Sequence, residues 1–139
     1  MQIRVFDQAD SSAVIALWRA CGLTRPWNSP SRDIARKIAE QPDLFLVAEM
    51  DGQVIGAVMG GYDGHRGSIN YLAVAPEHQG TGVGRALVER VEDLLRQRGC
   101  PKINLQVRLG NGDVGDFYRA LGYEPFQVID FGKRLIPDD

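Results

Sequence analysis

Apolar and polar residues alternate at the start of the chain and then change to a helical period. The alternation over residues 3–6 is typical of a half-buried strand. Asp10 follows, a residue type that often caps helices. The apolar positions after it recur at helical spacing, at Val14, Leu17, Trp18 and Cys21. The pattern therefore predicts one strand and then a helix that ends at Gly22.

A loop and a second helix are predicted next. Residues 23–30, LTRPWNSP, combine two prolines with asparagine and serine, which is the composition of a loop. Ser29 suits the cap of a helix and Pro30 suits its first position. Ile34 and Ile38 are four residues apart and give this short helix one apolar side.

Three apolar runs then predict a meander of strands. Residues 44–50 and 53–62 flank Asp51-Gly52, which is a strong hairpin signal. A second turn at 62–68 leads to residues 69–75. We expect these residues to form the third strand of the meander.

The second half of the chain opens on a glycine-rich stretch. Residues 77–87, EHQGTGVGRAL, place glycine at every second position and lead into a long helix that Gly99 ends. The apolar face of that helix comprises Leu87, Val88, Val91, Leu94 and Leu95. Residues 102–107 predict a strand and 114–122 a short helix. Residues 124–136 predict one bent strand or a terminal pair of strands.

The order of these elements predicts a single domain over residues 1–139, of the α/β class with a mixed sheet. The meander supplies antiparallel neighbours, whereas the strand–helix–strand unit from 69 to 107 requires a right-handed crossover and parallel pairing. We therefore expect a central, mostly antiparallel sheet with one parallel strand pair and helices on both faces. A chain of 139 residues suits one such domain.

Composition narrows the range of functions. A net charge of −2 offers no basic face for nucleic acid, and no run approaches the ~18 apolar residues of a membrane span. No signal peptide is evident, so a cytoplasmic location is expected. Cys21 and Cys100 form no spaced motif and are expected to be free thiols, with a single disulfide as the alternative. With His65 and His78 as the only histidines, no metal site is expected.

The glycine-rich stretch indicates an anion-binding loop. A dinucleotide-binding motif needs glycine where Arg85 stands, and a P-loop needs a lysine that this stretch lacks. What remains is the start of a helix, where the first amides have no intrahelical partner and the helix dipole is positive. Glycines let a phosphate approach those amides closely. A plain turn between strand and helix is the alternative.

Two motifs together resemble the GNAT superfamily of acetyl-coenzyme A-dependent N-acetyltransferases. Residues 72–99, LAVAPEHQGTGVGRALVERVEDLLRQRG, resemble its long central motif, [QR]-x-x-G-x-G/A between a strand and a helix. Residues 111–123, NGDVGDFYRALGY, resemble its second motif, in which a tyrosine follows an asparagine by seven residues. The element order matches too, so the resemblance covers nearly the full chain. RPWNSP and GGYDGHRG further resemble the YpeA-type branch of acetyltransferases.

The resemblance implies acetyl-CoA as co-substrate and direct attack by a primary amine through a tetrahedral intermediate. It implies that backbone groups of Leu72, Ala73 and Val74 pair with the pantetheine arm. Asn111 would contact the pantetheine or phosphate region, and Tyr118 would act as general acid near the thioester sulfur. The pyrophosphate would be held by the backbone amides of Gln79, Gly80, Thr81, Gly82, Val83, Gly84 and Arg85. Gln79 stands where many members have arginine, which removes one charged contact.

The acceptor side has fewer signals. The TRPWN segment resembles the family's acceptor-side wall, which makes Arg25, Trp27 and Asn28 candidate substrate contacts. A lysine-like amine with a pKa of ~10.4 is neutral in about one molecule in 2,500 at pH 7. A carboxylate or histidine acting through water could therefore collect its proton. The candidates are Glu49, Asp63, His65, Glu77 and His78, and the sequence does not choose among them.

Other interpretations remain open. Asn111 could simply cap a helix, Tyr118 could be a core side chain, and His65 could be a solvated turn residue. The domain could also be a non-catalytic CoA- or acyl-CoA-binding module, or a nucleotide-binding regulatory domain. The acceptor could be a small-molecule amine or a protein amine, and the last strands could supply a homodimer surface. Neither nucleic acid nor a membrane is expected as a partner.

Overall fold

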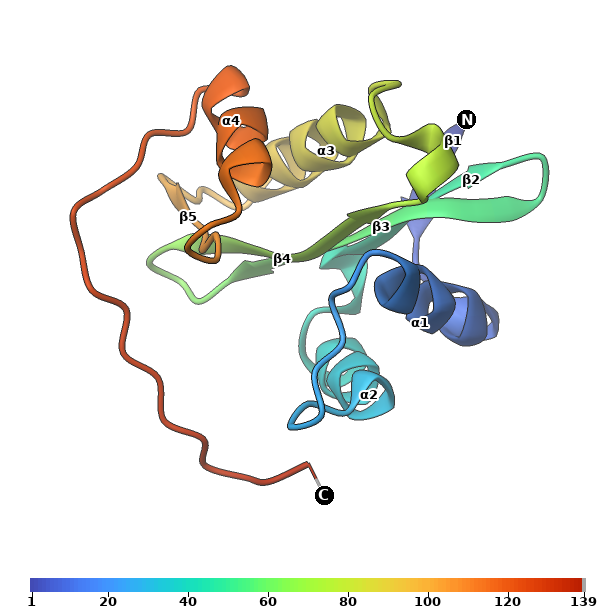
Figure 1. Cartoon of the computed structure of the whole chain (residues 1–139), viewed down its shortest axis with the longest axis horizontal. Helices are drawn as coiled ribbons and strands as arrows, with labels where there is room; N and C mark the ends of the chain where they lie inside the picture. Colours follow the sequence, from blue (N-terminus) through green and yellow to red (C-terminus); the bar gives the residue numbers. More distant parts are fainter. Residues whose placement is uncertain (139) are drawn as a thin grey trace.

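The computed structural model describes residues 1–138. Five strands of this part of the chain form one sheet, in the order β1-β2-β3-β4-β5 (Figure 1). The strands are β1 (Gln2–Val5), β2 (Phe45–Met50), β3 (Gln53–Tyr62), β4 (Gly67–Val74) and β5 (Ile103–Asn104). The first four strands are antiparallel neighbours, and β4 and β5 run parallel. The prediction of a mostly antiparallel sheet with one parallel pair is confirmed.

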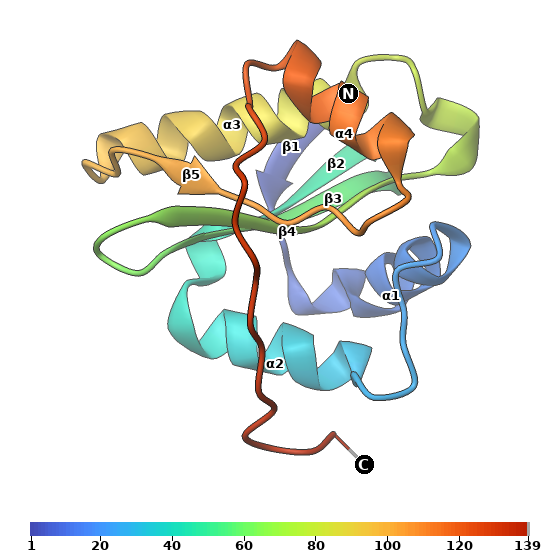
Figure 2. The ribbon, with the colours of Figure 1, turned by 60° about the vertical axis from the view of Figure 1, so that its left-hand side comes forward.

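Helices cover both faces of the sheet, as predicted. α1 (Ser11–Ala20) and α2 (Pro30–Glu40) lie on one face, and α3 (Val83–Gln97) and α4 (Gly112–Ala120) lie on the other (Figure 2). The described part of the chain also contains three short 3₁₀ turns, η1 (Gln8–Asp10), η2 (Pro42–Leu44) and η3 (Pro76–His78). No helix within residues 1–138 is both long and apolar enough to cross a membrane.

Two apolar clusters, one on each face, attach the helices to the sheet. On the α1 and α2 face, Trp18 and Phe45 are fully buried, and Phe6 stacks on Phe45 with ring centroids 4.2 Å apart. On the other face, the apolar positions of α3 pack under the helix: Leu87, Val88, Val91 and Leu95. Each such buried side chain contributes ~1.5–3 kcal/mol relative to an exposed one. The helical periodicity in the sequence therefore marks the surfaces that meet the sheet.

The helix caps agree with the sequence at α2 and differ at α1. Ser29 accepts a hydrogen bond from the Arg32 amide, as the Ser29-Pro30 pair predicts. Asp10 precedes α1, but its side chain makes no cap hydrogen bond to that helix. Instead its carboxylate accepts two hydrogen bonds from the Arg4 guanidinium, at 2.8 and 2.9 Å. Asp10 therefore occupies the predicted cap position, but it does not act as a side-chain cap because Arg4 and the Asp7 amide already bind its carboxylate.

The parallel pairing of β4 and β5 is much shorter than expected. The strand predicted over 102–107 pairs with β4 only at Ile103 and Asn104. Beyond that point Leu105 and Val107 still pack, half-buried, against the apolar cluster under α3. Alternate side chains therefore still pack against the core after the hydrogen bonds between β4 and β5 have ended. Beyond Asn104 the two segments separate.

No strand forms over residues 124–136, so the prediction of one or two terminal strands was wrong. These residues run as an extended, exposed segment from α4, past β5, to the vicinity of α2 (Figure 1, Figure 2). Their apolar side chains meet no partner strand, and Phe131 is 89% exposed. A strand needs a ladder as well as alternating side chains, and the pattern alone does not supply one.

Replacing Gly60 with alanine is expected to lower the free energy of unfolding by about 1–3 kcal/mol. A Cβ atom at Gly60 would lie 2.7 Å from Cγ1 of Val91, which is buried and β-branched and so cannot turn aside easily. Denaturant unfolding measures the change. Gly112→Ala is the matched control, because nothing lies within 4 Å of its Cβ position, and it should keep or slightly raise stability. Unchanged stability of Gly60→Ala would contradict this close packing.

Candidate active site

The glycines between β4 and α3 serve two different needs. Gly80 and Gly82 have φ angles of +77° and +93°, a left-handed conformation that other residues adopt at a cost. Gly84 lies at the start of α3, where a Cβ atom would come within 3.3 Å of Phe117 and 3.5 Å of Val74. The first two glycines shape the turn, and the third lets α3, α4 and β4 pack closely.

The start of α3 presents unpaired backbone amides. Gly82 occupies the cap position without a capping side chain, and the first hydrogen-bonded amide of the helix is that of Ala86, which donates to the Gly82 carbonyl. Among residues 1–138, the amides of Val83 to Arg85 make no recorded hydrogen bond. Arg85 itself turns along the helix to pair with Glu89 at 3.2 Å. The loop therefore offers N–H groups and the helix dipole to an anion, with no side chain in the way.

An open strand edge leads to that loop. The β4 residues after Ser68 pair with β3 on one side, while their other side faces the gap left by the divergence of β5. Leu72 and Ala73 lie along this edge, and the Val74 carbonyl accepts hydrogen bonds from the Gln79 side chain at 3.0 Å and the Cys21 thiol at 3.2 Å. An extended ligand could bind along the edge as an added strand and end at the amides of α3.

Tyr118 lies in the apolar cluster on the α3 face. Its ring meets those of Phe117 and Tyr123 edge to face, with centroids 5.1 and 5.5 Å away. Its side chain is buried, and burial raises the pKa of Tyr118 to about 12. The hydroxyl makes no recorded hydrogen bond within residues 1–138, whereas Tyr123 donates one to Glu92 at 2.8 Å. Tyr118 is thus a protonated hydroxyl that is free to donate to a bound group.

Asn111 precedes α4, which starts at Gly112, two residues earlier than the sequence predicts. Its side chain is exposed and makes no cap hydrogen bond, although its backbone carbonyl accepts one from the Gly115 amide. Asn111 is therefore at the cap position without acting as a side-chain cap. Its amide group is available to a ligand.

The opposite face of β4 holds a pair that the sequence did not reveal. The Tyr71 hydroxyl donates a hydrogen bond of 2.7 Å to Asp33 of α2, and Trp18 stacks on the Tyr71 ring at 3.9 Å. Tyr71 has a φ of +53°, at the point where the register of β3 and β4 shifts. Burial and the Asp33 carboxylate raise the pKa of the Tyr71 hydroxyl. The pair depends on a β-bulge and a helix placement that no local pattern encodes.

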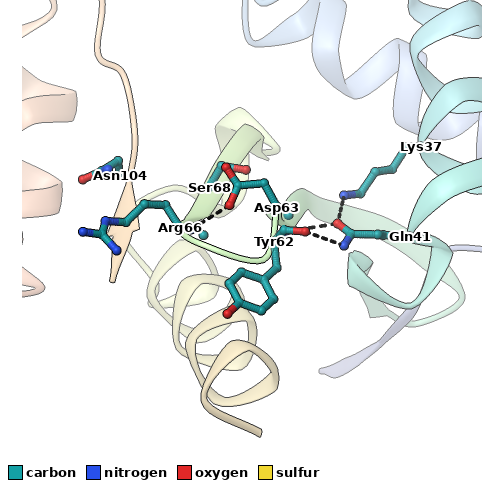
Figure 3. Close-up of a pocket in the computed structure, with 9 residues that line it drawn as sticks. Lys37, Gln41, Tyr62, Asp63, Arg66, Ser68 and Asn104 are labelled. Carbon is teal, nitrogen blue, oxygen red and sulfur yellow. Dashed lines mark hydrogen bonds between the residues drawn. The ribbon is translucent and has the colours of Figure 1, made fainter. Parts of the chain in front are cut away.

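A cavity of about 550 Å³ lies on this same face, at the narrow end of the gap between β4 and β5. Figure 3 shows Lys37 and Gln41 on one side of it and Arg66 and Asn104 on the other. Ser68 and Asp63 lie between them (Figure 3). All of these side chains are polar, so the cavity suits a polar ligand.

The predicted acceptor contacts lie in the loop before α2. Arg25 donates to the carbonyls of Gly22 and Thr24, both at 2.8 Å, so its guanidinium folds back onto its own loop. Trp27 is 56% exposed, and Asn28 accepts a hydrogen bond from Arg134. The loop is therefore joined to the 124–138 segment, which passes outside it.

Asp138 fixes the far end of the 124–138 segment. Its side chain is 1% exposed and accepts hydrogen bonds from the Ser29 amide at 2.7 Å and the Arg36 guanidinium at 2.5 Å. Arg36, together with the Ser29 amide, holds the pKa of Asp138 down to about 2. The segment thus borders the face of the molecule that carries Tyr71 and the cavity.

The candidate bases from the sequence are dispersed. Glu49 pairs with Arg4 on the β1–β2 side of the sheet, and Asp63 accepts the amides of His65 and Arg66 in a turn. His65 is exposed in that turn, and Glu77 and His78 lie in η3. Of the five, only Asp63 lines the cavity. Within residues 1–138 no group of three or more histidine, cysteine, aspartate or glutamate side chains could hold a metal ion, and both cysteines are free.

Known proteins resemble this chain over nearly its whole length. The acetyltransferase (GNAT) family matches residues 12–123. An acetyltransferase of Pectobacterium atrosepticum is 55% identical over 138 residues, which cover 99% of this chain and 98% of that protein. The ribosomal-protein-alanine N-acetyltransferase of Brucella melitensis has a TM-score of 0.73 at 25% identity, over 89% of this chain and 85% of its own. An aminoglycoside 6'-N-acetyltransferase of Acinetobacter haemolyticus shares the fold with a TM-score of 0.75 at 21% identity, over 98% and 100%.

Asp138→Ala is expected to release the 124–138 segment, because the change removes the carboxylate that joins it to Ser29 and Arg36. Trypsin should then cut after Lys133 or Arg134 several-fold faster at pH 7. In the wild type the low pKa of Asp138 has a matching consequence: the anchor is complete above pH ~4 and is lost as the pH falls through about 2. Asp116→Ala, an exposed carboxylate paired within α4, is the control. Equal cutting rates in all three proteins would contradict the anchor.

Proposed function

The chain belongs to the acetyltransferase (GNAT) family, and we propose that it transfers the acetyl group of acetyl-CoA to a primary amine. The observation that carries the proposal is the open edge of β4 that ends at the unpaired amides of α3. This arrangement fits a long, extended molecule with a pyrophosphate at one end. The amine could belong to a small molecule or to a protein.

The coenzyme fits the chain at three points. The amides from Gln79 to Arg85 would hold the pyrophosphate, since Gly80 and Gly82 leave open space where side chains would otherwise stand. The backbone of Leu72 to Val74 would pair with the pantetheine arm. The exposed Asn111 side chain would contact the arm or the phosphates from the start of α4. Bound there, acetyl-CoA supplies an activated acetyl group.

Tyr118 would assist the departure of the thiol. Its raised pKa keeps the hydroxyl protonated at neutral pH, and its ring is fixed between Phe117 and Tyr123. A thiol with a pKa near ~8.5 is already a tolerable leaving group, so a hydrogen bond from Tyr118 helps without being indispensable. Backbone N–H groups of β4 would stabilise the negative charge that develops on the acetyl oxygen.

A non-catalytic CoA- or acyl-CoA-binding module is the second candidate, and the dispersed positions of the candidate bases favour it. Thiol release from acetyl-CoA across a panel of amines separates the two. Tight CoA binding without amine-dependent release would support the module and contradict the enzyme. Stabilisation by ATP or NAD but not by CoA in thermal unfolding would instead indicate a nucleotide-binding domain.

Tyr118→Phe is expected to lower kcat by roughly 10²-fold, the lower end for a general acid, with KM for acetyl-CoA little changed. The loss should be greatest with poor acceptor amines, for which expulsion of the thiol limits the rate. Tyr123→Phe is the control, because its hydroxyl is already bonded to Glu92. Full activity of Tyr118→Phe at every pH would exclude Tyr118 as the acid.

Gly82→Ala is expected to weaken CoA binding about tenfold or more, measured by calorimetry. The new methyl group strains a backbone at φ +93° by ~1–2 kcal/mol and intrudes on the space assigned to the pyrophosphate. Gly64→Ala imposes the same strain at φ +91° in the turn between β3 and β4. Both variants should lose similar stability, and only Gly82→Ala should lose CoA affinity. Equal CoA affinity in the two variants would count against the assigned loop.

A further inference from the structure

The cavity beside Lys37 carries positive charge that the described residues do not neutralise. Lys37 donates hydrogen bonds to the Gly60 carbonyl and the Gln41 side chain, and no carboxylate within residues 1–138 pairs with it. Among residues 1–138, the Arg66 guanidinium donates only to the neighbouring His65 carbonyl. Both cations line the same cavity, which also presents the Ser68 hydroxyl and the Asn104 amide. These groups can all donate hydrogen bonds to an anion.

One carboxylate, that of Asp63, also lines the cavity, and it already accepts hydrogen bonds from the backbone. Asp63 accepts the backbone amides of His65 and Arg66, both at 2.7 Å. These bonds lower the pKa of Asp63 and hold it in the turn. Burial and the nearby Arg98 guanidinium lower the pKa of Lys37, so the ammonium gains from any anion that approaches it. Two cations and one engaged carboxylate leave the cavity with an excess of positive charge.

The walls of the cavity are held in place by the fold. Gln41 donates to the Tyr62 carbonyl at 2.8 Å and accepts from the Tyr62 amide at 3.1 Å, which fixes the end of β3. Gly61 lies beside Ser68, and a Cβ atom there would come within 2.8 Å of the Ser68 hydroxyl and 3.6 Å of the Lys37 ammonium. The missing side chain leaves the polar groups uncovered. The cavity is therefore a built feature of the contact between the C-terminal end of α2 and the end of β3.

The position of the cavity along β4 relates it to the acceptor. The pyrophosphate loop follows the end of β4, and the arm would run back along Val74 and Leu72, so the thioester would reach the region of Tyr71. Ser68 lies three residues further along the strand, about 10 Å away. The cavity is thus on the far side of the thioester from the coenzyme loop, where an acceptor would lie, and it is too remote to hold the pyrophosphate.

The acceptor face carries opposite charges at its two ends. Asp33 accepts a hydrogen bond from the Tyr71 hydroxyl and pairs with Arg36 at 3.2 Å, an arginine that it shares with Asp138. It lies one helical turn before Lys37 on α2, a rise of about 6 Å. The Asp33 carboxylate would attract an ammonium close to the thioester, while Lys37 and Arg66 would attract an anion beyond it. A short molecule with an amine at one end and an anionic group at the other matches both ends at once.

Resting on the proposed acetyl transfer, we propose that the acceptor is a primary amine that also carries an anionic group, bound in the Lys37–Arg66 cavity. The anionic group is a carboxylate or a phosphate, and both share the chemistry that the cavity offers. The amine lies at the Tyr71–Asp33 end, next to the thioester. Lys37 and Arg66 thereby determine specificity and hold the acceptor in register for attack.

The test compares matched amines with and without an anionic group. Thiol release is measured with 6-aminohexanoate against hexylamine, and with 5-aminopentyl phosphate against 5-aminopentanol. The proposal expects kcat/KM to be at least about tenfold higher for the anionic member of one pair or both, mainly through KM. The pair with the larger ratio tells whether a carboxylate or a phosphate is preferred.

Variants of the cavity then localise the preference. Arg66→Gln should lower the ratio of anionic to neutral kcat/KM about tenfold. Arg90→Gln, an exposed arginine of α3 on the other face of the sheet, should keep the wild-type ratio. Lys37→Gln provides a second cavity variant, and circular dichroism checks its folding because Lys37 also holds the Gly60 carbonyl.

Failure of this inference is distinguishable from failure of the proposed function. Turnover with equal kcat/KM for both members of each pair, or an unchanged ratio in Arg66→Gln, would overturn the anionic acceptor and leave the acetyltransferase activity standing. Absence of turnover with every amine would count against the proposed function. Calorimetric titration of 6-aminohexanoate and 5-aminopentyl phosphate into the CoA complex then decides the cavity alone. Binding that Arg66→Gln weakens supports it, and no binding overturns it.

Discussion

The separation of β4 from β5 is the constraint on which the proposed site depends. Parallel pairing stops after Ser68 and Asn104, and from there the outer edge of β4 has no partner strand. Unpaired backbone groups are costly unless something binds to them, so a fold retains such an edge only when water or a ligand satisfies it. Leu105 and Val107 stay packed under α3, which keeps the diverging chain from closing over the edge.

The two ends of that opening are built differently. At the wide end, α3 begins with uncapped amides. Gly84 in its first turn lets Phe117 of α4 and Val74 of β4 pack close to the helix. At the narrow end, α2 reaches the sheet with polar side chains, and the cavity forms between its residues and those of β4 and β5. One end therefore suits the phosphates of a coenzyme, and the other suits a small polar acceptor. In the proposed reaction, the sheet between them would bring the two substrates together.

The sequence predicted the elements whose information is local. Helical periods, the Asp51-Gly52 turn and the Ser29-Pro30 start each depend on neighbouring residues, and the structure confirms them. The length of β5 and the state of residues 124–136 depend on whether a distant strand is available for pairing. Alternating apolar residues cannot specify that, so both predictions exceeded what the structure contains. The Asp10 side chain likewise makes no cap hydrogen bond, because its carboxylate pairs with Arg4 and the local pattern does not specify that ion pair.

A signal for the acceptor side was nevertheless present in α2. Its apolar face has only Ile34 and Ile38. Asp33 and Lys37 each precede one of these isoleucines, and Gln41, the residue just after the helix, continues the four-residue spacing. All three polar residues contact the sheet, at Tyr71, at the Gly60 carbonyl and at the Tyr62 backbone. A helix that needed only to cover a sheet would place apolar side chains at those positions, since each buried polar group must find a partner. The polar residues Asp33, Lys37 and Gln41 therefore indicate a helix that contributes to a binding surface as well as to the core. The charge changes from negative at Asp33 to positive at Lys37, along the direction in which an acceptor would lie.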